Sequence, residues 1–352
     1  MLVSHLDRKR FAPTVLSLKD QGEWADRIRD SGVPVIELRR RRRLELSRLW
    51  GLWRTIRDVR PDLLVTWMYP ASIWGRLVAL PAGVPHLIAC ERAGDFYGRL
   101  HLWLERLLAR HTDFVVFNSR YNEERMKKAL GRTRTRTIYN VLELPRVDPA
   151  AGRDLLRRLG VPPLAALVGM VASLHPRKDH DLFLEIAAWL SSRPDVHFLI
   201  IGGGSERQRL EREVARLGLG RRVTFTGFVE DPLPLMACLR VKVLTSAIEG
   251  MANVLMEAMA LGVPCVVSAA GANPELITDG VEGFVIRERD PAAYAERIGA
   301  LLDNPERWVA ASRAARCRVT DGTFSAQTVV RAYEDLFAEV LAGGATSRRG
   351  SS

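Results

Sequence analysis

Short runs of β-branched and apolar residues alternate along the chain with longer segments in which apolar residues recur at helical spacing. The short runs lack polar alternation, which is typical of strands buried on both faces in a parallel sheet. Strands are predicted at 14–18, 33–38, 63–68, 86–90, 114–118, 136–141, 166–173, 196–202, 223–227, 241–246, 264–269 and 283–286. Helical patterns between them include 181–192, 205–217 and 291–301.

This pattern occurs twice, and the break between its two halves lies around 141–154, where two prolines and no sustained periodicity indicate a linker. The chain of 352 residues is long enough for two buried cores. We therefore predict an α/β fold of two doubly wound, Rossmann-like domains facing one another across a cleft. The predicted segments are a first domain at 1–145, a second at 146–322, a C-terminal helix at 323–342 and a disordered polar tail at 343–352.

Composition and cysteine spacing narrow the class of protein. A hydrophobic content of 47% with 26% charged residues is typical of globular chains. The four cysteines lie far apart without a CxxC pair, which argues against a disulfide framework and a structural zinc site. The first ten residues lack the apolar core of a signal peptide, and no apolar run reaches the roughly 18 residues that span a bilayer. We expect a cytoplasmic protein.

The net charge of +11 is unevenly distributed. Residues 1–140 hold 27 Lys and Arg against 15 Asp and Glu, so the whole excess lies in this half. Such a basic field attracts nucleic acid, an anionic membrane or a phosphorylated acceptor, and charge alone does not choose among them. No nucleic-acid-binding motif accompanies it, so we expect no nucleic-acid partner.

Five arginines at 39–43 precede a helical pattern in this basic half. Its apolar stripe of Leu49, Leu52, Trp53 and Ile56 is predicted to be core. Six of the eight tryptophans also lie before residue 104, and Trp with Arg suits the headgroup region of an anionic membrane. Peripheral attachment to the inner face of a membrane is therefore one prediction, and solvated arginines beside a loop are the alternative.

A candidate ligand site follows the predicted strand at 241–246. Ligands of doubly wound sheets bind at the carboxyl ends of strands, and Glu249 and Gly250 fall there. Gly250 allows backbone N–H groups at the start of the next helix to approach hydroxyls or phosphates. Glu257 lies four residues beyond Asn253 on the same helical face, suited to a second pair of hydroxyls. The alternative is that Glu249 is only a negative charge at a helix start, where the helix dipole stabilises it, and that Glu257 is a solvated surface residue.

The stretch "EGMANVLMEAMALGVPCVVS", with "ANPELITDGVEGFVI" after it, resembles the signature region of the GT4-type retaining glycosyltransferases of the GT-B fold. The E-x7-E motif of that family matches Glu249 and Glu257. The resemblance covers nearly the whole chain, because "ERAGD", "NSRYN", "VASLHPRKDH" and "VTFTGFVEDP" fall in family order.

The resemblance implies a role for each matching position. Glu249 lies at the transferred sugar, Glu257 holds the ribose and Lys178 neutralises the leaving diphosphate. The cradle for sugar hydroxyls and the distal phosphate is implied at Gly250, Met251, Ala252, Asn253 and Val254, and the edge that meets the base at Phe228 and Val229. In the family an arginine also neutralises the diphosphate, and Ser173 occupies the matching position in this chain. Arg177 either supplies the missing positive charge or is a solvated loop residue.

On the acceptor side, Glu91 is the candidate for an acceptor-orienting or base-like residue, and a structural ion pair with Arg92 or another basic neighbour is the alternative. The "DHD" at 179–181 superficially resembles a metal-binding motif, but aspartates at the start of a helix cap its N–H groups. The family that the chain resembles needs no metal, so we expect no metal and no other cofactor.

The resemblance implies a metal-independent transferase that moves a sugar with retention from a nucleoside-diphosphate sugar to a cell-envelope or exopolysaccharide glycan, and we expect that acceptor to be lipid-linked. Domain 1–145 would then bind the acceptor and domain 146–322 the nucleotide sugar. Two alternatives are a nucleotide-sugar epimerase of the same fold and a donor-binding pseudoenzyme.

Family members begin with a strand and a glycine-rich loop, before the helix that "MLVSHLDRKRF" ends. This chain departs from that pattern, and we expect both features to be missing through a start site placed too far downstream or through truncation. Since the first strand of a doubly wound sheet is central, its loss would remove pairing from both neighbours.

Overall fold

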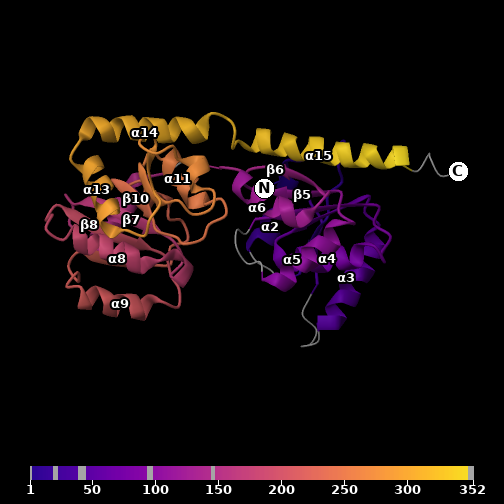
Figure 1. Cartoon of the computed structure of the whole chain (residues 1–352), viewed down its shortest axis with the longest axis horizontal. Helices are drawn as coiled ribbons and strands as arrows, with labels where there is room; N and C mark the ends of the chain where they lie inside the picture. The colour runs from indigo at the N-terminus through magenta and orange to yellow at the C-terminus, as the bar shows by residue number, and fades with distance from the viewer. Residues whose placement is uncertain (1, 19–22, 39–44, 93–97, 144–146, 348–352) are drawn as a thin grey trace. The chain divides into compact units, whose positions relative to one another are not determined.

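The computed structural model describes residues 2–18, 23–38, 45–92, 98–143 and 147–347 (Figure 1). Its contacts divide the chain into two compact units. Unit 1 comprises Met1–Val141 and Ser325–Ser352, and unit 2 comprises Leu142–Phe324. The last helix therefore belongs to unit 1, and it continues to Ser347, into the segment expected to be a tail.

Unit 2 is built on a parallel sheet of six strands in the order β12-β11-β10-β7-β8-β9. The strands are β7 Ala166–Val171, β8 Val196–Ile201, β9 Val223–Gly227, β10 Val241–Leu244, β11 Cys265–Ser268 and β12 Gly283–Ile286. The predicted apolar runs coincide with them, because five of the six strands are almost entirely buried. The strand order reverses between β7 and β10, which makes the carboxyl ends of these two strands the switch point of the sheet.

Helices cover both faces of this sheet (Figure 1). The first of them are α7 Pro149–Arg158, the 3-10 turn η1 Pro176–Lys178, α8 His180–Trp189, α9 Arg207–Arg216 and α10 Leu233–Met236. The rest are α11 Asn253–Ala260, α12 Asn273–Leu276, α13 Pro291–Leu302 and α14 Pro305–Thr320. Phe183, Leu210 and Ile298 of α8, α9 and α13 share one apolar core with the strands, and α11 packs against β11 and α14.

Unit 1 contains two parallel sheets where one was predicted. One has the order β3-β4-β5-β6, with β3 Leu63–Trp67, β4 His86–Glu91, β5 Phe114–Phe117 and β6 Arg134–Thr137. The other pairs β1 Val15–Ser17 with β2 Val35–Glu37. Among the described residues no ladder joins β1 to β3. Leu16 and Leu64 nevertheless pack in a common apolar cluster, so the same helices cover both sheets.

The helices of unit 1 are α1 Leu2–His5, α2 Glu23–Asp30, α3 Glu45–Val59, α4 Tyr69–Ala79, α5 Arg99–Ala109, α6 Arg120–Leu130 and α15 Ala326–Ser347. Helix α15 packs on the sheet of unit 1, where Tyr333 and Phe337 share a core with Ile88 (Figure 1). Glu339 of α15 also forms ion pairs with Arg134 and Arg136 of β6. These contacts attach the end of the chain to unit 1.

The apolar stripe of α3 is core, as predicted: Leu52 and Ile56 are buried, and Leu49 and Trp53 pack against them. The arginine run at 39–43 lies outside the described residues. No helix within the described ranges is both long enough and apolar enough to cross a membrane.

Candidate functional site

Hydrogen bonds join the two loops that leave the switch point of unit 2. The Thr245 hydroxyl, just after β10, lies 3.0 Å from the Lys178 carbonyl and 2.9 Å from that of Asp179, to which it can donate. The Ala247 N–H donates to the Arg177 carbonyl at 3.0 Å. The loop after β10 is therefore held against the η1 turn that follows β7, and residues predicted in both loops come together.

Lys178 and Glu249 meet at this junction. The Lys178 ammonium donates to Oε1 of Glu249 at 2.6 Å, from a side chain that is 26% exposed. Glu249 itself is buried. A cation and a carboxylate are thus fixed side by side at the edge of the sheet.

Three backbone N–H groups lie beside this pair, just before α11. Those of Gly250, Met251 and Ala252 donate no hydrogen bond within the described part of the chain. They precede Asn253, where α11 begins as predicted, and Asn253 is exposed while Val254 is half-buried. Donors near the positive end of a helix favour anionic and hydroxyl groups of a ligand.

Gly271 packs against the loop that carries Glu249 and Gly250, and its role was not predicted from the sequence. Its φ is +57°, and a Cβ there would lie 1.9 Å from the carbonyl oxygen of Glu249. The Ala272 N–H donates to the Gly250 carbonyl at 3.1 Å. Only glycine allows this close approach, so the signal available in the sequence was a glycine soon after a predicted strand.

Glu257 lies on α11, one turn beyond the N–H groups, and is partly buried. Burial raises the pKa of its carboxyl group, Lys242 opposes this rise and Asp231 adds to it. Its carboxylate makes no hydrogen bond or ion pair among the described residues. It is therefore available to a ligand, and is not the fully solvated surface residue of the alternative interpretation.

Ser173 and Phe228 lie close to the same glycine. A Cβ on Gly203 would lie 3.3 Å from Cβ of Phe228, and Leu174, next to Ser173, donates its N–H to the Gly203 carbonyl at 2.9 Å. The Phe228 side chain is largely exposed, Ser173 is exposed and Val229 is half-buried. An exposed aromatic ring at this edge offers a surface on which a planar group can stack.

The "DHD" segment has structural roles. Asp179 caps α8 by accepting the Leu182 N–H at 3.2 Å, as the sequence predicted, and it also binds Arg289. Asp181 pairs with Arg209 at 2.7 Å. His180 is buried, and burial lowers its pKa to about 4, so its imidazole is neutral at physiological pH.

Glu91, the remaining predicted catalytic residue, lies in unit 1 at the end of β4. It is buried, and burial together with Glu105 raises the pKa of its carboxyl to about 7 against the opposing effect of Arg76. Arg76 and Glu105 form a fully buried hydrogen-bonded pair that the sequence did not reveal. The Arg92 guanidinium lies over the Trp67 ring, 4.6 Å from its centroid, and among the described residues no ion pair joins it to Glu91. The basic neighbour that acts on Glu91 is Arg76.

The same edge of unit 1 carries backbone strain. Met68 follows β3 with a φ of +65° and a ψ of 160°, and its N–H donates to the Cys90 carbonyl at 3.1 Å. This conformation is costly for a residue with a side chain, and such strain is concentrated at functional sites. Tyr69 is exposed beside it and packs its ring against His101 at 4.4 Å.

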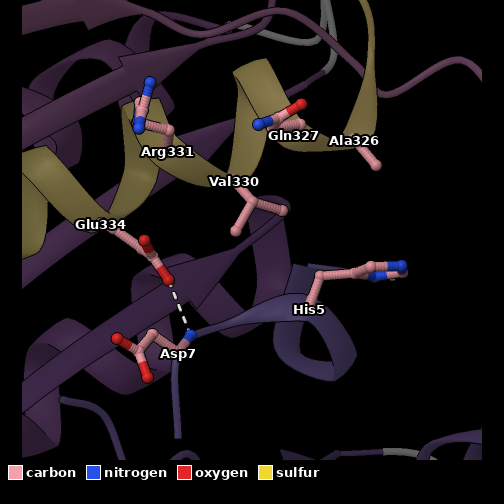
Figure 2. Close-up of a pocket in the computed structure, with 7 residues that line it drawn as sticks. All are labelled: His5, Asp7, Ala326, Gln327, Val330, Arg331 and Glu334. Carbon is pink, nitrogen blue, oxygen red and sulfur yellow. Dashed lines mark hydrogen bonds between the residues drawn. The ribbon is translucent and has the colours of Figure 1, made fainter. Parts of the chain in front are cut away.

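A cavity of about 360 Å³ lies elsewhere in unit 1, between α1 and α15 (Figure 2). The Asp7 N–H donates to Oε1 of Glu334 at its rim, at 2.7 Å. Its lining residues are His5, Asp7, Ala326, Gln327, Val330, Arg331 and Glu334, none of which is a predicted site residue. The cavity is therefore separate from the candidate site.

Comparison with known proteins agrees with the family resemblance of the sequence. The family model "Glycosyl transferases group 1" matches residues 165–304, and "Glycosyl transferase 4-like domain" matches residues 1–140. The lipopolysaccharide core biosynthesis glycosyltransferase LpsE of Rhizobium meliloti (strain 1021) is 30% identical, over 80% of this chain and 77% of that protein. The UDP-Gal:alpha-D-GlcNAc-diphosphoundecaprenol alpha-1,3-galactosyltransferase of Escherichia coli is 25% identical, over 74% of this chain and 71% of that protein.

Among solved structures, Anabaena Alr3699/HepE in complex with UDP resembles this chain with a TM-score of 0.83. The match covers 96% of this chain and 95% of that one at 24% identity, a level that bears on the fold alone. The sequence matches extend through both units, and the fold matches over nearly the whole length. The chain belongs to the GT4-type glycosyltransferases and has the GT-B fold.

Proposed function

We propose that this glycosyltransferase takes its sugar from a nucleoside-diphosphate sugar bound at the switch point of unit 2. The observation that carries the proposal is the juxtaposition of Lys178, Glu249 and the free N–H groups of Gly250–Ala252 at one strand edge. A diphosphate needs cationic and N–H donors, and sugar hydroxyls need a carboxylate acceptor. Three structures of one protein with this fold, Anabaena Alr3699/HepE, contain UDP, UDP with glucose, or UDP-glucose, which supports the proposal.

Each residue of the site then binds a different part of the donor. Lys178 and the N–H groups stabilise the charge that develops on the leaving diphosphate, and Glu249 accepts hydrogen bonds from the transferred sugar. Glu257 holds the ribose hydroxyls, with the base near Phe228 and Val229. Ser173 and Arg177 face the diphosphate from the η1 side, Ser173 as a hydroxyl donor and Arg177 as an exposed cation.

We propose transfer with retention, in which the acceptor oxygen attacks from the face that the diphosphate leaves. Catalysis then rests on placement and on preorganised charge, since these two effects supply most of the rate in such a site. Lys178 and the N–H groups provide the positive charge, so EDTA is expected to leave the rate unchanged.

The proposed acceptor is a lipid-linked glycan of the cell envelope or of an exopolysaccharide, bound by unit 1. Glu91 has a pKa near 7 and a strained neighbouring segment, which suits a group that holds and releases a proton at an acceptor hydroxyl. The LpsE and galactosyltransferase relatives are named for lipopolysaccharide core and diphosphoundecaprenol-linked substrates, which supports this class.

We also propose that unit 1 binds the inner face of an anionic membrane. Trp24, Trp50 and Trp103 are each more than half exposed, and the guanidinium groups of Arg27 and Arg54 lie 5.0 and 5.5 Å from the ring centroids of Trp24 and Trp50. Indole rings flanked by guanidinium groups suit the headgroup layer of a bilayer.

The experiment that tests the donor proposal is a thermal melt with UDP, GDP or ADP, followed by proton NMR of the sugar released from the matching donor. An α-linked donor should first release the α-anomer, with Lys178→Ala as the inactive control. First release of the β-anomer would contradict retention. Conversion of the donor to an epimeric nucleotide sugar would favour the epimerase. Binding of the donor without turnover, even in the presence of membrane lipid extract, would favour the pseudoenzyme.

A further inference from the structure

The ammonium group of Lys242 is completely buried beneath the proposed nucleotide site. Val241 and Val243 of β10 belong to the core shared with α8 and α13. Because side chains alternate along a strand, Lys242 points to the opposite face, where α11 packs on the sheet. Its Nζ has no hydrogen-bond partner in the described part of the chain. An unpaired buried charge destabilises a fold, so an apolar side chain would serve packing better here.

The charged and titratable groups around Lys242 belong to β11, α11 and the two switch-point loops, since Gly169 faces it from β7. Cys265 lies opposite Lys242 in the register of the neighbouring strand β11. Glu257 of α11 and Glu249 and Lys178 of the switch-point loops affect Lys242 electrostatically. Burial lowers the pKa of Lys242 to about 8, and the nearby carboxylates oppose that fall. Lys242 is therefore still largely protonated at neutral pH.

Glu257 is subject to two opposite charges. Lys242 acts on it from the sheet and favours the ionised carboxylate, whereas Asp231, in the loop before α10, disfavours it. No hydrogen bond within the described residues fixes the carboxyl group in one protonation state. Its ionisation therefore depends on the balance of burial with these two charges.

We propose that Lys242 is a positioning residue that keeps Glu257 ionised and so able to accept hydrogen bonds from both ribose hydroxyls of the donor. This inference rests on the proposed function, since Glu257 must be the group that holds the ribose. Lys242 lies under the sheet surface and acts through Glu257, without touching the nucleotide. A protonated Glu257 would lose acceptor capacity, and the nucleotide would bind more weakly.

The test is the dissociation constant of UDP, with GDP and ADP in parallel, measured by calorimetry from pH 5 to 9.5. For the wild type, affinity should fall as the pH drops through the pKa of Glu257. In Lys242→Met the midpoint should move up by about 1 pH unit, because the removal of an opposite charge raises a carboxyl pKa. Below that midpoint the variant should bind up to about tenfold more weakly. The two curves should converge near pH 9, where wild-type Lys242 is itself neutral.

Two further variants make the shift specific. Asp231→Asn removes the like charge and should move the midpoint down, and its amide oxygen can still accept the Leu233 N–H that Asp231 binds at 3.1 Å. Glu257→Gln should show only the pH dependence of the nucleotide. If Lys242→Met does not fold, Lys242→Gln replaces it as a neutral side chain.

The outcomes separate the two proposals. If the wild type binds none of the three nucleotides, the proposed function fails and the inference fails with it. If the wild type binds but the neutral Lys242 variants keep its midpoint, the role of Lys242 is overturned and the donor site stands. A purely structural role would change the melting temperature of the free protein and leave the midpoint in place.

Discussion

Lys178 and Glu249, separated by 71 residues in the chain, are joined by a hydrogen bond of 2.6 Å at the switch point of unit 2. The bond joins the loop after β7 to the loop after β10 and fixes the two side chains relative to each other. A donor that brings a diphosphate to Lys178 and hydroxyls to Glu249 must exchange this bond for its own. The pair thus holds the two loops of the site in one arrangement.

Removal of the Lys178 charge should lower the rate of transfer. We expect Lys178→Ala to reduce kcat by about 100- to 1000-fold, as for the loss of one preorganised donor at a developing charge. Lys178→Arg keeps the charge and should retain more of the activity. Steady-state kinetics with a saturating donor give the comparison, and equal rates for Lys178→Ala and the wild type would remove Lys178 from the mechanism.

Glu257→Ala should abolish the stabilisation that nucleotide gives to the wild type. A ligand at about 100 times its dissociation constant stabilises by about 2.7 kcal/mol, which a thermal melt resolves easily. Glu296→Ala changes an exposed glutamate on α13 and should melt like the wild type. An undiminished shift in Glu257→Ala would show that the ribose is held elsewhere.

The loop behind Glu249 should tolerate no side chain at position 271. Gly271→Ala places a Cβ against the Glu249 carbonyl, so we expect weaker UDP binding, by about tenfold or more for a loss of 1.4 kcal/mol. Gly280→Ala is the matched control, because Gly280 also has a positive φ, of +80°, but nothing lies within 4 Å of the added atom. Both should lose stability, and only Gly271→Ala should lose affinity; equal affinities would refute the positioning role.

Glu91 should make stability fall as the pH rises. Its folded pKa of about 7 exceeds the ordinary value of 4.5, so the folded chain holds a proton that the unfolded chain releases between these pH values. The loss in free energy of unfolding is absent below pH 4.5 and complete above pH 7, where it amounts to about 3 kcal/mol. Glu91→Gln should therefore be more stable than the wild type at pH 8 and similar at pH 4.5.

Urea unfolding at both pH values measures this difference. Glu124→Gln, at an exposed position on α6, is the control and should follow the wild type throughout. A constant difference between Glu91→Gln and the wild type across the pH range would mean that Glu91 is not protonated in the fold.

Binding to anionic vesicles should depend on the exposed tryptophans of unit 1. We expect Trp50→Ser combined with Trp103→Ser to lower partitioning by about tenfold or more, because each indole loses apolar area that the lipid would bury. Trp189→Ser removes an equally exposed indole from unit 2 and serves as the control. Equal losses in sedimentation with phosphatidylserine vesicles would contradict a specific role for unit 1.

The strands could be predicted because parallel strands buried on both faces are apolar without alternation. The exception is β6, predicted at 136–141 and observed at Arg134–Thr137. It lies at a sheet edge and reads "RTRT", and its arginines bind Glu339 from the far end of the chain. A polar strand stabilised by a contact across 200 residues leaves no periodic signal in the sequence.

The site residues were predicted largely from the family resemblance, and their mutual contacts came from the structure. Spacing alone favoured neither Lys178 nor its bond to Glu249, because the two belong to different loops. Lys242 was visible as a charge within an apolar strand, but only the strand register and the packing of α11 identify its neighbours. The Arg76–Glu105 pair lies on two helices whose patterns gave no reason to join them.

Unit 2 is inserted into the sequence of unit 1, and its two ends lie together. The N–H of Leu142 donates to the carbonyl of Phe324 at 2.8 Å, directly next to the two crossings of the chain. Residues 142–324 thus form one uninterrupted cassette with adjacent splice points. A chimaera that takes this cassette from a relative needs only two junctions and leaves unit 1 and its final helix intact. Under the proposed function, such an exchange would transfer the donor preference of the relative.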